Sequence, residues 1–142
     1  MTTLLKVLRF LGPIFLFFSL LVALPSYLIS YFNQSADEVM GLILLLGVGY
    51  SGVILFTLRS KKFIYTPRDG FLITLVSWVL VSLIAAIPFF NFGMTYTDSF
   101  FEAVSGLTTT GSTTISSLID LPKHLLMYRQ LLQWAGGVGL VI

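Results

Sequence analysis

Six consecutive small residues are the part of this chain best suited to chemistry: Thr108-Thr109-Thr110-Gly111-Ser112-Thr113. They follow a short amphipathic stretch and lie between segments apolar enough to cross a bilayer. Polar backbone at membrane depth is tolerated only where protein or a water-filled cavity surrounds it. A half-length helix that ends in a glycine-containing polar strand can present backbone carbonyls to a cation. The segment therefore indicates ion permeation rather than catalysis.

Residues 96–107 form the predicted half-helix in front of this segment. Thr95 to Asp98 fits a capping box, and Ser99 to Glu102 fits a second one, a turn later. At about 1.5 Å per residue the half-helix reaches only about 18 Å, against about 30 Å of hydrocarbon, so it cannot span. Its C-terminal end carries a partial negative charge, which favours a cation near the polar segment.

Two charged residues flank the polar segment. Glu102 is the one acid inside the apolar half-helix, and an ionisable residue at membrane depth is a functional hypothesis by default. The interpretation we favour is structural, with Glu102 hydrogen-bonded to the following loop. Arg129 lines an outer vestibule or pairs with an acid such as Asp120, and we favour pairing. His124 is expected to be a polar surface residue.

Composition excludes several functional classes. Hydrophobic residues make up 56% of the chain and charged residues 10%, whereas a soluble domain has about 25% charged residues. Cysteine is absent, which rules out disulfides and thiolate metal sites. The glycines of residues 136–139 lack the strand and spacing of a dinucleotide loop and suit close helix packing. We expect no enzyme, no cofactor and no nucleic-acid partner, and we interpret the net charge of +2 as loop charges.

Three apolar segments are predicted to position the polar one, at about residues 10–32, 39–58 and 70–90. Each has roughly the 20 residues that a spanning helix needs. The first is too long for the apolar region of about 7–15 residues in a signal peptide, so we interpret it as a retained anchor. Pro25 should kink this segment. The second segment carries a small-residue face formed by Gly41, Gly47, Gly49 and Gly52.

Basic residues predict the orientation. If the three spans alternate, one side receives Lys6, Arg9, Arg59, Lys61, Lys62 and Arg68. The positive-inside rule makes this side the cytoplasm and places the N-terminus there, in a multi-pass plasma-membrane protein. The acidic loop at residues 33–38 then lies outside, together with Lys123 and Arg129.

The region after the polar segment is predicted to return to the outer surface. Residues 112–120 are polar and β-prone, residues 123–133 are amphipathic, and a new apolar helix is expected to start near Leu131. From there to Ile142 the helix would reach only about 18 Å, which suggests a fragment of a longer protein. The predicted fold class is an all-α integral membrane protein. It has three transmembrane helices, a re-entrant pore half-helix with an extended filter loop, and the start of a further transmembrane helix.

The stretch FFEAVSGLTTTGSTT, residues 100–114, resembles the filter region of the Trk/Ktr/HKT superfamily of potassium transporters, and its Trk-type members most of all. The stretch YRQLLQWAGGVG, residues 128–139, resembles the start of that family's following helix. RDGFL, residues 68–72, resembles the entry to its preceding helix. The first two spans fit the extra N-terminal helix pair of Trk-type members by pattern.

This resemblance implies four repeats of helix, pore half-helix, filter and helix around one pore. Residues 1–66 would be the extra helix pair, and residues 67–142 the first repeat with a truncated second helix. Gly111 would be the filter glycine, and the carbonyls of Thr109, Thr110 and Gly111, with Ser112 beside them, would replace water around potassium. Thr108 would sit at the inner end of the filter, and Glu102 and Arg129 would support it structurally.

The resemblance also implies partners and a location. Members of this type are homodimers in the bacterial inner membrane and work with a cytosolic nucleotide-binding regulatory subunit. Two other functions fit the residues alone. One is a secondary carrier with a re-entrant hairpin, because such carriers also place polar breaks at the bilayer midplane. The other is a membrane scaffold that transports nothing, in which the threonine segment is only a connection.

Overall fold

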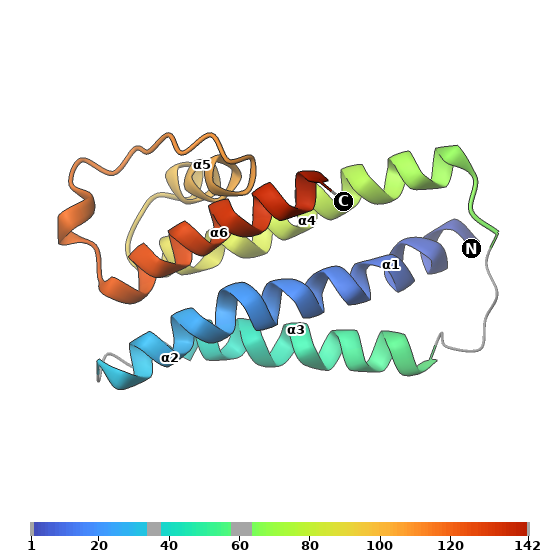
Figure 1. Cartoon of the computed structure of the whole chain (residues 1–142), viewed down its shortest axis with the longest axis horizontal. Coiled ribbons are helices and arrows are strands. Elements are labelled where there is room, and N and C mark those ends of the chain that lie inside the picture. Colours follow the sequence, from blue (N-terminus) through green and yellow to red (C-terminus); the bar gives the residue numbers. More distant parts are fainter. Residues whose placement is uncertain (1, 34–37, 58–63, 142) are drawn as a thin grey trace.

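The computed structural model describes residues 2–33, 38–57 and 64–141, and all regular elements in these ranges are helices (Figure 1). The all-α prediction is therefore confirmed for this part of the chain. The elements in order are α1 (Thr2–Phe18), a π-helix η1 (Ser19–Ala23), α2 (Leu24–Phe32), α3 (Glu38–Thr57), α4 (Pro67–Asn91), α5 (Tyr96–Leu107), a 3-10 turn η2 (Leu118–Asp120) and α6 (Lys123–Val141).

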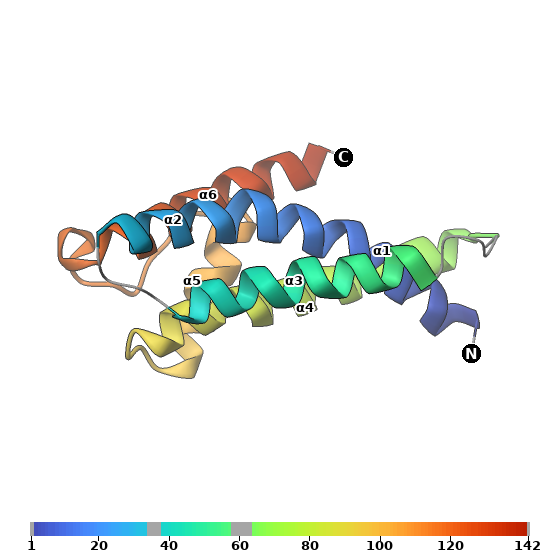
Figure 2. The same cartoon turned by 90° about the horizontal axis from the view of Figure 1, so that it is seen from below.

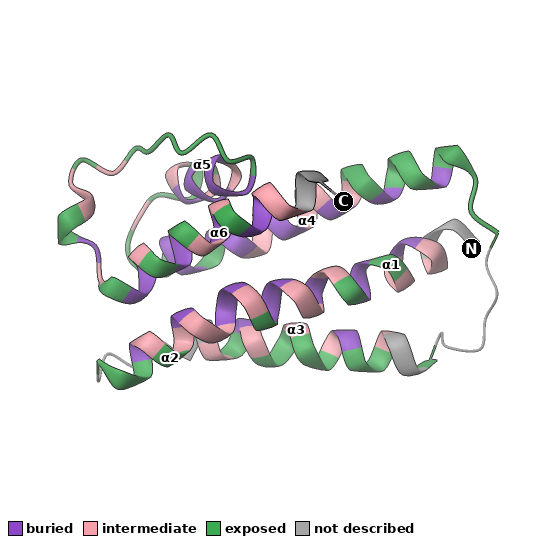
Figure 3. Cartoon of the chain, in the orientation of Figure 1, coloured by how far each residue is buried: buried purple, intermediate pink, exposed green. Residues whose placement is uncertain are grey.

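The long helices lie in two layers. The continuous rod of α1, η1 and α2 packs lengthwise against α3, and both lie beneath α4 and α6 (Figure 1). The short helix α5 runs across this direction, since it is seen nearly end-on in Figure 1 and from the side in Figure 2. It contacts both α4 and α6. Buried residues face the interior between the layers, whereas the outer surfaces of α3 and α4 are largely exposed (Figure 3).

Two helices in the described ranges are long and apolar enough to cross a bilayer, Leu5–Phe32 and Pro67–Asn91. Within α3, residues Gly41–Ile54 form a shorter apolar helix. The three predicted segments thus correspond to helices, and the first begins earlier than expected, in α1. The loop residues 34–37 and the basic residues Arg59, Lys61 and Lys62 lie outside the described part of the chain.

The kink expected at Pro25 takes the form of a π-helix. Proline has no N–H group, so it cannot donate the α-helical bond to the carbonyl four residues earlier. Here the five residues of η1 immediately precede α2, and a π-turn inserts one extra residue into the helical repeat. The hydroxyl of Ser26 donates to the Val22 carbonyl at 2.9 Å. The rod therefore continues through the proline with a local change of direction.

Small residues bring α3 close to this rod, as the sequence predicted for part of its glycine face. A Cβ at Gly47 would lie 1.7 Å from Ser19 Oγ, and a Cβ at Gly41 would lie 3.0 Å from the Tyr27 ring. The hydroxyl of Ser51 donates to the Gly12 carbonyl of α1 at 2.8 Å. Gly49 and Gly52, in contrast, have open space around them. Only half of the predicted glycine face is used for packing within this chain.

The start of α4 is tied to α1 by a charge pair. Thr66 and Asp69 form a capping box, in which each side chain bonds to the backbone N–H of the other residue. Lys6 Nζ donates to the same Asp69 carboxylate oxygen at 2.6 Å. Because Lys6 is near the N-terminus and Asp69 is in the first turn of α4, these two ends lie on one side of the molecule, as the predicted alternation of the helices requires.

The region after residue 111 differs from the sequence prediction. Residues 112–117 have no regular structure, and η2 follows them. Helix α6 is continuous from Lys123, so no new helix starts near Leu131. The physical reason is that Leu125, Tyr128 and Leu132, spaced three and four residues apart, are all buried on one face. The amphipathic stretch and the apolar stretch are therefore one helix.

Candidate functional site

Helix α5 has the bounds that its sequence predicted, Tyr96–Leu107. The hydroxyl of Thr95 accepts a bond from the Asp98 N–H at 3.2 Å and donates to the Asp98 carboxylate at 2.6 Å. The second predicted capping box does not start a helix, because Ser99 already lies inside α5 and its hydroxyl donates to the Thr95 carbonyl. The end of α5 then leads directly into residues 108–114, which we call the threonine loop.

The first peptide groups of the threonine loop turn back toward α5. The N–H groups of residues 108–111 donate to carbonyls of the last helical turn, at 2.8 to 3.2 Å. All peptide bonds in the described residues are trans, so the carbonyl of each peptide group points opposite to its N–H. The carbonyls of Thr108, Thr109 and Thr110 therefore point away from the end of α5. All three residues are exposed.

This orientation depends on backbone angles that side chains disfavour. Thr109 has a φ of 59° and Gly111 a φ of 74°. Within the described ranges, Thr109 is the only non-glycine residue with positive φ, and a β-branched residue in this region is strained. A Cβ at Gly111 would meet nothing nearer than Gln133 Nε2 at 3.9 Å. Glycine is thus favoured at position 111 by its backbone angle rather than by lack of space.

A buried arginine holds the next two carbonyls. Arg129 is 4% exposed, and its Nη2 donates to the Gly111 carbonyl at 2.8 Å and to the Ser112 carbonyl at 3.3 Å. The hydroxyl of Ser105 donates to the Ser112 carbonyl at 2.6 Å. These two carbonyls therefore face α6, whereas no described side chain donates a hydrogen bond to the three threonine carbonyls before them.

Glu102 completes this network from α5. It is fully buried, and its Oε2 accepts from Arg129 Nε at 3.0 Å. Its Oε1 accepts from the Thr113 hydroxyl at 2.5 Å and from the Thr114 N–H at 2.7 Å. A buried charge is costly unless it is paired and hydrogen-bonded, and here both conditions hold. Arg129 thus pairs with Glu102 and not with Asp120, the acid suggested by the sequence.

Close packing of α6 on α5 places the network. A Cβ at Gly136 would lie 1.9 Å from the Leu107 carbonyl oxygen, and a Cβ at Gly106 would lie 3.1 Å from Leu132 Cβ. Gly136 therefore serves helix packing, the alternative that the sequence favoured for this group of glycines. Since Leu107 is the last residue of α5, the approach at Gly136 fixes where the threonine loop begins.

Other candidate residues lie apart from the loop or were not anticipated. His124 is 8% exposed and therefore buried, which corrects its prediction as a surface residue. The described residues contain no group of three or more His, Asp or Glu side chains that could hold a metal ion. Sequence reasoning missed Ser105 and Thr113, whose hydroxyls bond to the network. The only signals for them were a hydroxyl in the last turns of the half-helix, for Ser105, and a place in the polar segment that follows it, for Thr113.

Comparison with known protein families matches residues 38–142 to the TrkH family, described as cation transport proteins. The Trk system potassium uptake protein TrkH of Salmonella typhimurium is 34% identical over 137 residues. The match covers 94% of this chain and 28% of that protein. TrkH of Vibrio parahaemolyticus is 36% identical over 142 residues, which cover 96% of this chain and 29% of the relative.

Solved structures give the same result. The crystal structure of the potassium transporter TrkH from Vibrio parahaemolyticus superposes with a TM-score of 0.80 at 33% identity. The superposition covers 97% of this chain and 30% of that chain. This chain therefore spans less than a third of the length of the relatives that it matches.

Proposed function

The chain belongs to the TrkH family of cation transport proteins, and we propose on this basis that it is the N-terminal part of a potassium-translocating subunit. In this proposal, residues 1–66 are an accessory helix pair and residues 67–142 are the first pore repeat. The threonine loop is then one of the filter strands that surround the ion. Supporting this assignment, a half-length helix ends where a strained backbone turns its carbonyls outward.

The single observation that carries the proposal is the direction of the peptide groups after α5. The N–H groups of residues 108–111 bond to the helix end, so the carbonyls of Thr108, Thr109 and Thr110 are presented to an ion as a row of oxygens. Rings of backbone carbonyls replace the hydration shell of potassium in selective pores. In this proposal Gly111 continues the row at its outer end, and Ser112 lies beside it, because the Ser112 carbonyl already accepts from both Arg129 and Ser105. A carbonyl oxygen has two lone pairs, so a bond from Arg129 leaves one for the ion.

The Glu102–Arg129 pair gives the filter rigidity without adding charge. Arg129 alone would place an uncompensated positive charge beside a cation path, because its Nη2 lies 2.8 Å from the Gly111 carbonyl oxygen. The carboxylate of Glu102 at 3.0 Å cancels that charge. We therefore assign Glu102 and Arg129 to the support of the filter. The partial negative charge at the end of α5 adds to the attraction for a cation.

The setting of this subunit follows from the family and the charge pattern. We place the chain in a bacterial plasma membrane with its N-terminus in the cytoplasm, where Lys6 and Arg68 lie near the start of α4. The relatives named above are called potassium uptake proteins of the Trk system. A homodimeric full-length subunit and a cytosolic nucleotide-binding regulatory subunit are the partners that we propose.

The proposal is tested by ion uptake through a complete transporter. We define the chimera as Vibrio parahaemolyticus TrkH in which this chain replaces the segment that it matches. Cells that lack their own potassium importers express the chimera, and tracer uptake of rubidium and of sodium is measured at equal membrane levels of protein. A second culture expresses the 142-residue chain alone.

The Gly111→Ser variant is expected to lower the ratio of rubidium to sodium uptake by roughly tenfold, because a serine at a φ of 74° distorts the carbonyl row. Gly49→Ser is the control, since Gly49 has open space around it and lies away from the loop. An unchanged ratio in Gly111→Ser would contradict the filter assignment and favour the scaffold. Saturable uptake of an organic substrate without cation uptake would instead favour a secondary carrier.

A further inference from the structure

One of the contacts between the N-terminal helices and the filter repeat is an aromatic cluster, which consists of Phe18, Phe89 and Tyr128. The Tyr128 ring lies 6.4 Å from the Phe18 ring, nearly perpendicular to it, and 5.7 Å from the Phe89 ring. Tyr128 is fully buried, and its hydroxyl donates to the Ala85 carbonyl of α4 at 3.2 Å. Side chains of three helices, α1, α4 and α6, therefore meet at a single residue.

Tyr128 is adjacent in the sequence to Arg129, so the aromatic cluster is linked to the network around the threonine loop. Consecutive residues of a helix point in directions about 100° apart, so Tyr128 faces the interior between the layers while Arg129 faces α5 and the threonine loop. A rotation or shift of α6 that moves Tyr128 must also move Arg129. Phe18 thus contacts the residue next to Arg129, which makes the hydrogen bonds to the Gly111 and Ser112 carbonyls.

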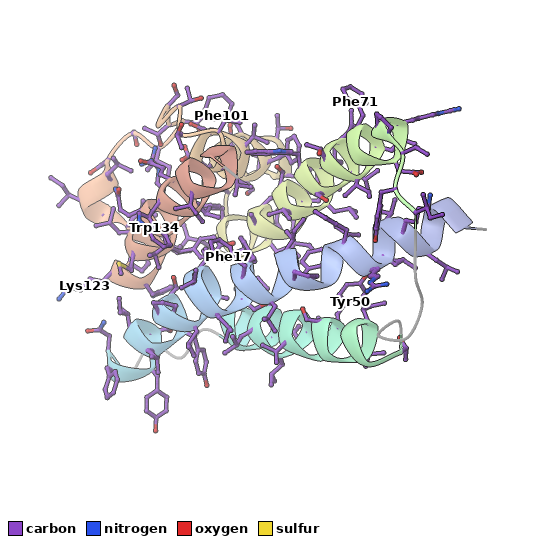
Figure 4. The ribbon with its side chains drawn as sticks, turned by 45° about the vertical axis from the view of Figure 1, so that its right-hand side comes forward. Phe17, Tyr50, Phe71, Phe101, Lys123 and Trp134 are labelled. Atoms are coloured by element: carbon purple, nitrogen blue, oxygen red, sulfur yellow. The ribbon has the colours of Figure 1, made fainter. Side chains whose placement is uncertain are left out.

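The local structure of the first rod places Phe18 there. It is the last residue of α1, and the π-helix η1 follows it at once. Beyond this change of direction, both η1 and α2 continue along α6. Figure 2 shows α2 overlying α6, and Figure 4 shows the side chain of Phe17, the neighbour of Phe18, among those that fill the space between α1 and the upper layer. The rod therefore supports α6 on the side opposite to α5.

We infer that the N-terminal helices brace the filter, and that Phe18 and Tyr128 are positioning residues which hold Arg129 against the Gly111 and Ser112 carbonyls. This goes beyond the proposed function, on which its ion-selectivity part rests. This role explains why α1 and α6 share an aromatic contact, although neither ring touches the threonine loop itself. It gives the helix pair a role in selectivity rather than only in membrane anchoring.

The experiment compares two phenylalanine substitutions in the chimera. Phe18→Ala removes the ring that contacts Tyr128. Phe15→Ala is the matched control, because Phe15 is also buried on α1, but its ring contacts Tyr50 of α3 at 5.4 Å. Both variants create a cavity in the same helix, and only one lies at the brace. Phe18→Leu, which refills most of the volume, serves as the conservative variant.

The first readout is hydrogen exchange of a peptide covering residues 108–114, which does not depend on ion transport. Phe18→Ala is expected to speed this exchange by roughly fivefold or more. The coupling free energy between residues in contact is typically large enough to change the equilibrium for local opening of the loop by this factor. Phe15→Ala should leave it unchanged, and Phe18→Leu should restore most of the protection. Unchanged exchange in Phe18→Ala, or an equal increase in Phe15→Ala, would overturn the brace.

The second readout is the ratio of rubidium to sodium uptake at equal membrane levels of protein. Phe18→Ala should lower this ratio about fivefold, in line with its effect on exchange, while Phe15→Ala should change total uptake only. If exchange quickens in Phe18→Ala but neither this variant nor Gly111→Ser alters the ratio, the brace stands and the proposed filter function fails. If Gly111→Ser lowers the ratio and Phe18→Ala alters neither readout, the filter stands and the brace fails.

Discussion

Two regions of this chain bury polar groups in different ways. In the N-terminal helices, two buried serines bond to helix carbonyls: Ser26 donates to Val22 and Ser51 donates to Gly12. Around the threonine loop, the buried groups are charged, and Glu102 and Arg129 bond across α5, α6 and the loop. The first arrangement lets helices approach closely. The second holds irregular backbone, which has no ladder of its own to satisfy its carbonyls.

The difference teaches where each kind of polar group is needed. The backbone N–H and carbonyl groups of a regular helix bond to one another. A serine at a helix contact therefore needs a hydrogen-bond partner only for its own hydroxyl. An extended loop between helices needs donors and acceptors from outside, and it needs them in fixed positions if its carbonyls are to face an ion. The charged network supplies both, at the cost of depending on every member of the network.

The largest effect is expected from breaking the charge pair. Glu102→Gln or Arg129→Gln alone should destabilise the chimera by about 3–5 kcal/mol, because each leaves an uncompensated buried charge. Rubidium uptake should fall with stability. The double variant should recover much of the stability, since no charge remains, but not the preference for rubidium over sodium. Thermal unfolding in detergent together with uptake measures both effects. If the single variants were as stable as the parent, the Glu102–Arg129 pair would not be the main support of the threonine loop.

A smaller effect is expected from substitution of Gly136 in α6, with the adjacent Gly137 as the control. Gly136→Ala places a methyl group 1.9 Å from the Leu107 carbonyl oxygen, so α5 must shift, at a cost of about 1–3 kcal/mol. Gly137→Ala is the control, because its nearest neighbour would be Thr109 Cγ2 at 3.7 Å, an ordinary contact. Unfolding temperature and the rubidium-to-sodium ratio should fall in the first variant only. Similar behaviour of the two variants would show that α6 does not fix the start of the loop.

The smallest effect is expected in the N-terminal helices. Gly47→Ala should destabilise by about 1 kcal/mol, because its Cβ would lie 1.7 Å from Ser19 Oγ, a terminal atom that can move aside. Among the residues that the structure describes, Ser19 Oγ has no hydrogen-bond partner, so Ser19→Ala should itself be neutral or stabilising. In the Ser19→Ala background the penalty of Gly47→Ala should shrink, which a double-mutant cycle on unfolding temperature measures. Simple additivity would mean that the two residues do not compete for this space.

The sequence predicted features that depend on neighbouring residues. The bounds of α5 follow from the cap at Thr95 and from apolar spacing, and both are local signals. The expected row of carbonyls was Thr109, Thr110 and Gly111, whereas in the structure the carbonyls of Thr108, Thr109 and Thr110 point away from α5 and that of Gly111 accepts from Arg129. Gly136 was assigned to packing because glycines in an apolar helix allow close approach, although its contact with Leu107 was not predicted.

Features that depend on the three-dimensional arrangement could not be predicted. Arg129 was matched with the nearer acid Asp120, whereas its partner Glu102 is 27 residues away and is brought close by the packing of α5 on α6. The burial of His124 was missed because a lone histidine in an amphipathic stretch carries no local signal of burial. The continuity of α6 was missed because the charged residues in its first half obscured the helical spacing of Leu125, Tyr128 and Leu132 in the sequence.

The most direct test of the central claim asks whether potassium occupies the threonine loop. The chain has no cysteine, so a single one can be introduced at Thr110 in a chimera whose remaining part is also free of cysteine. Modification of this thiol by a small charged reagent is timed in potassium, in sodium and in choline. Ile119, which is 94% exposed and lies beyond the loop, gives the control position.

The account predicts that potassium slows modification at position 110 relative to choline, with sodium less effective, and that modification at position 119 is equally fast in all three salts. Equal rates at position 110 in potassium and in choline would contradict the claim that this loop binds the transported ion.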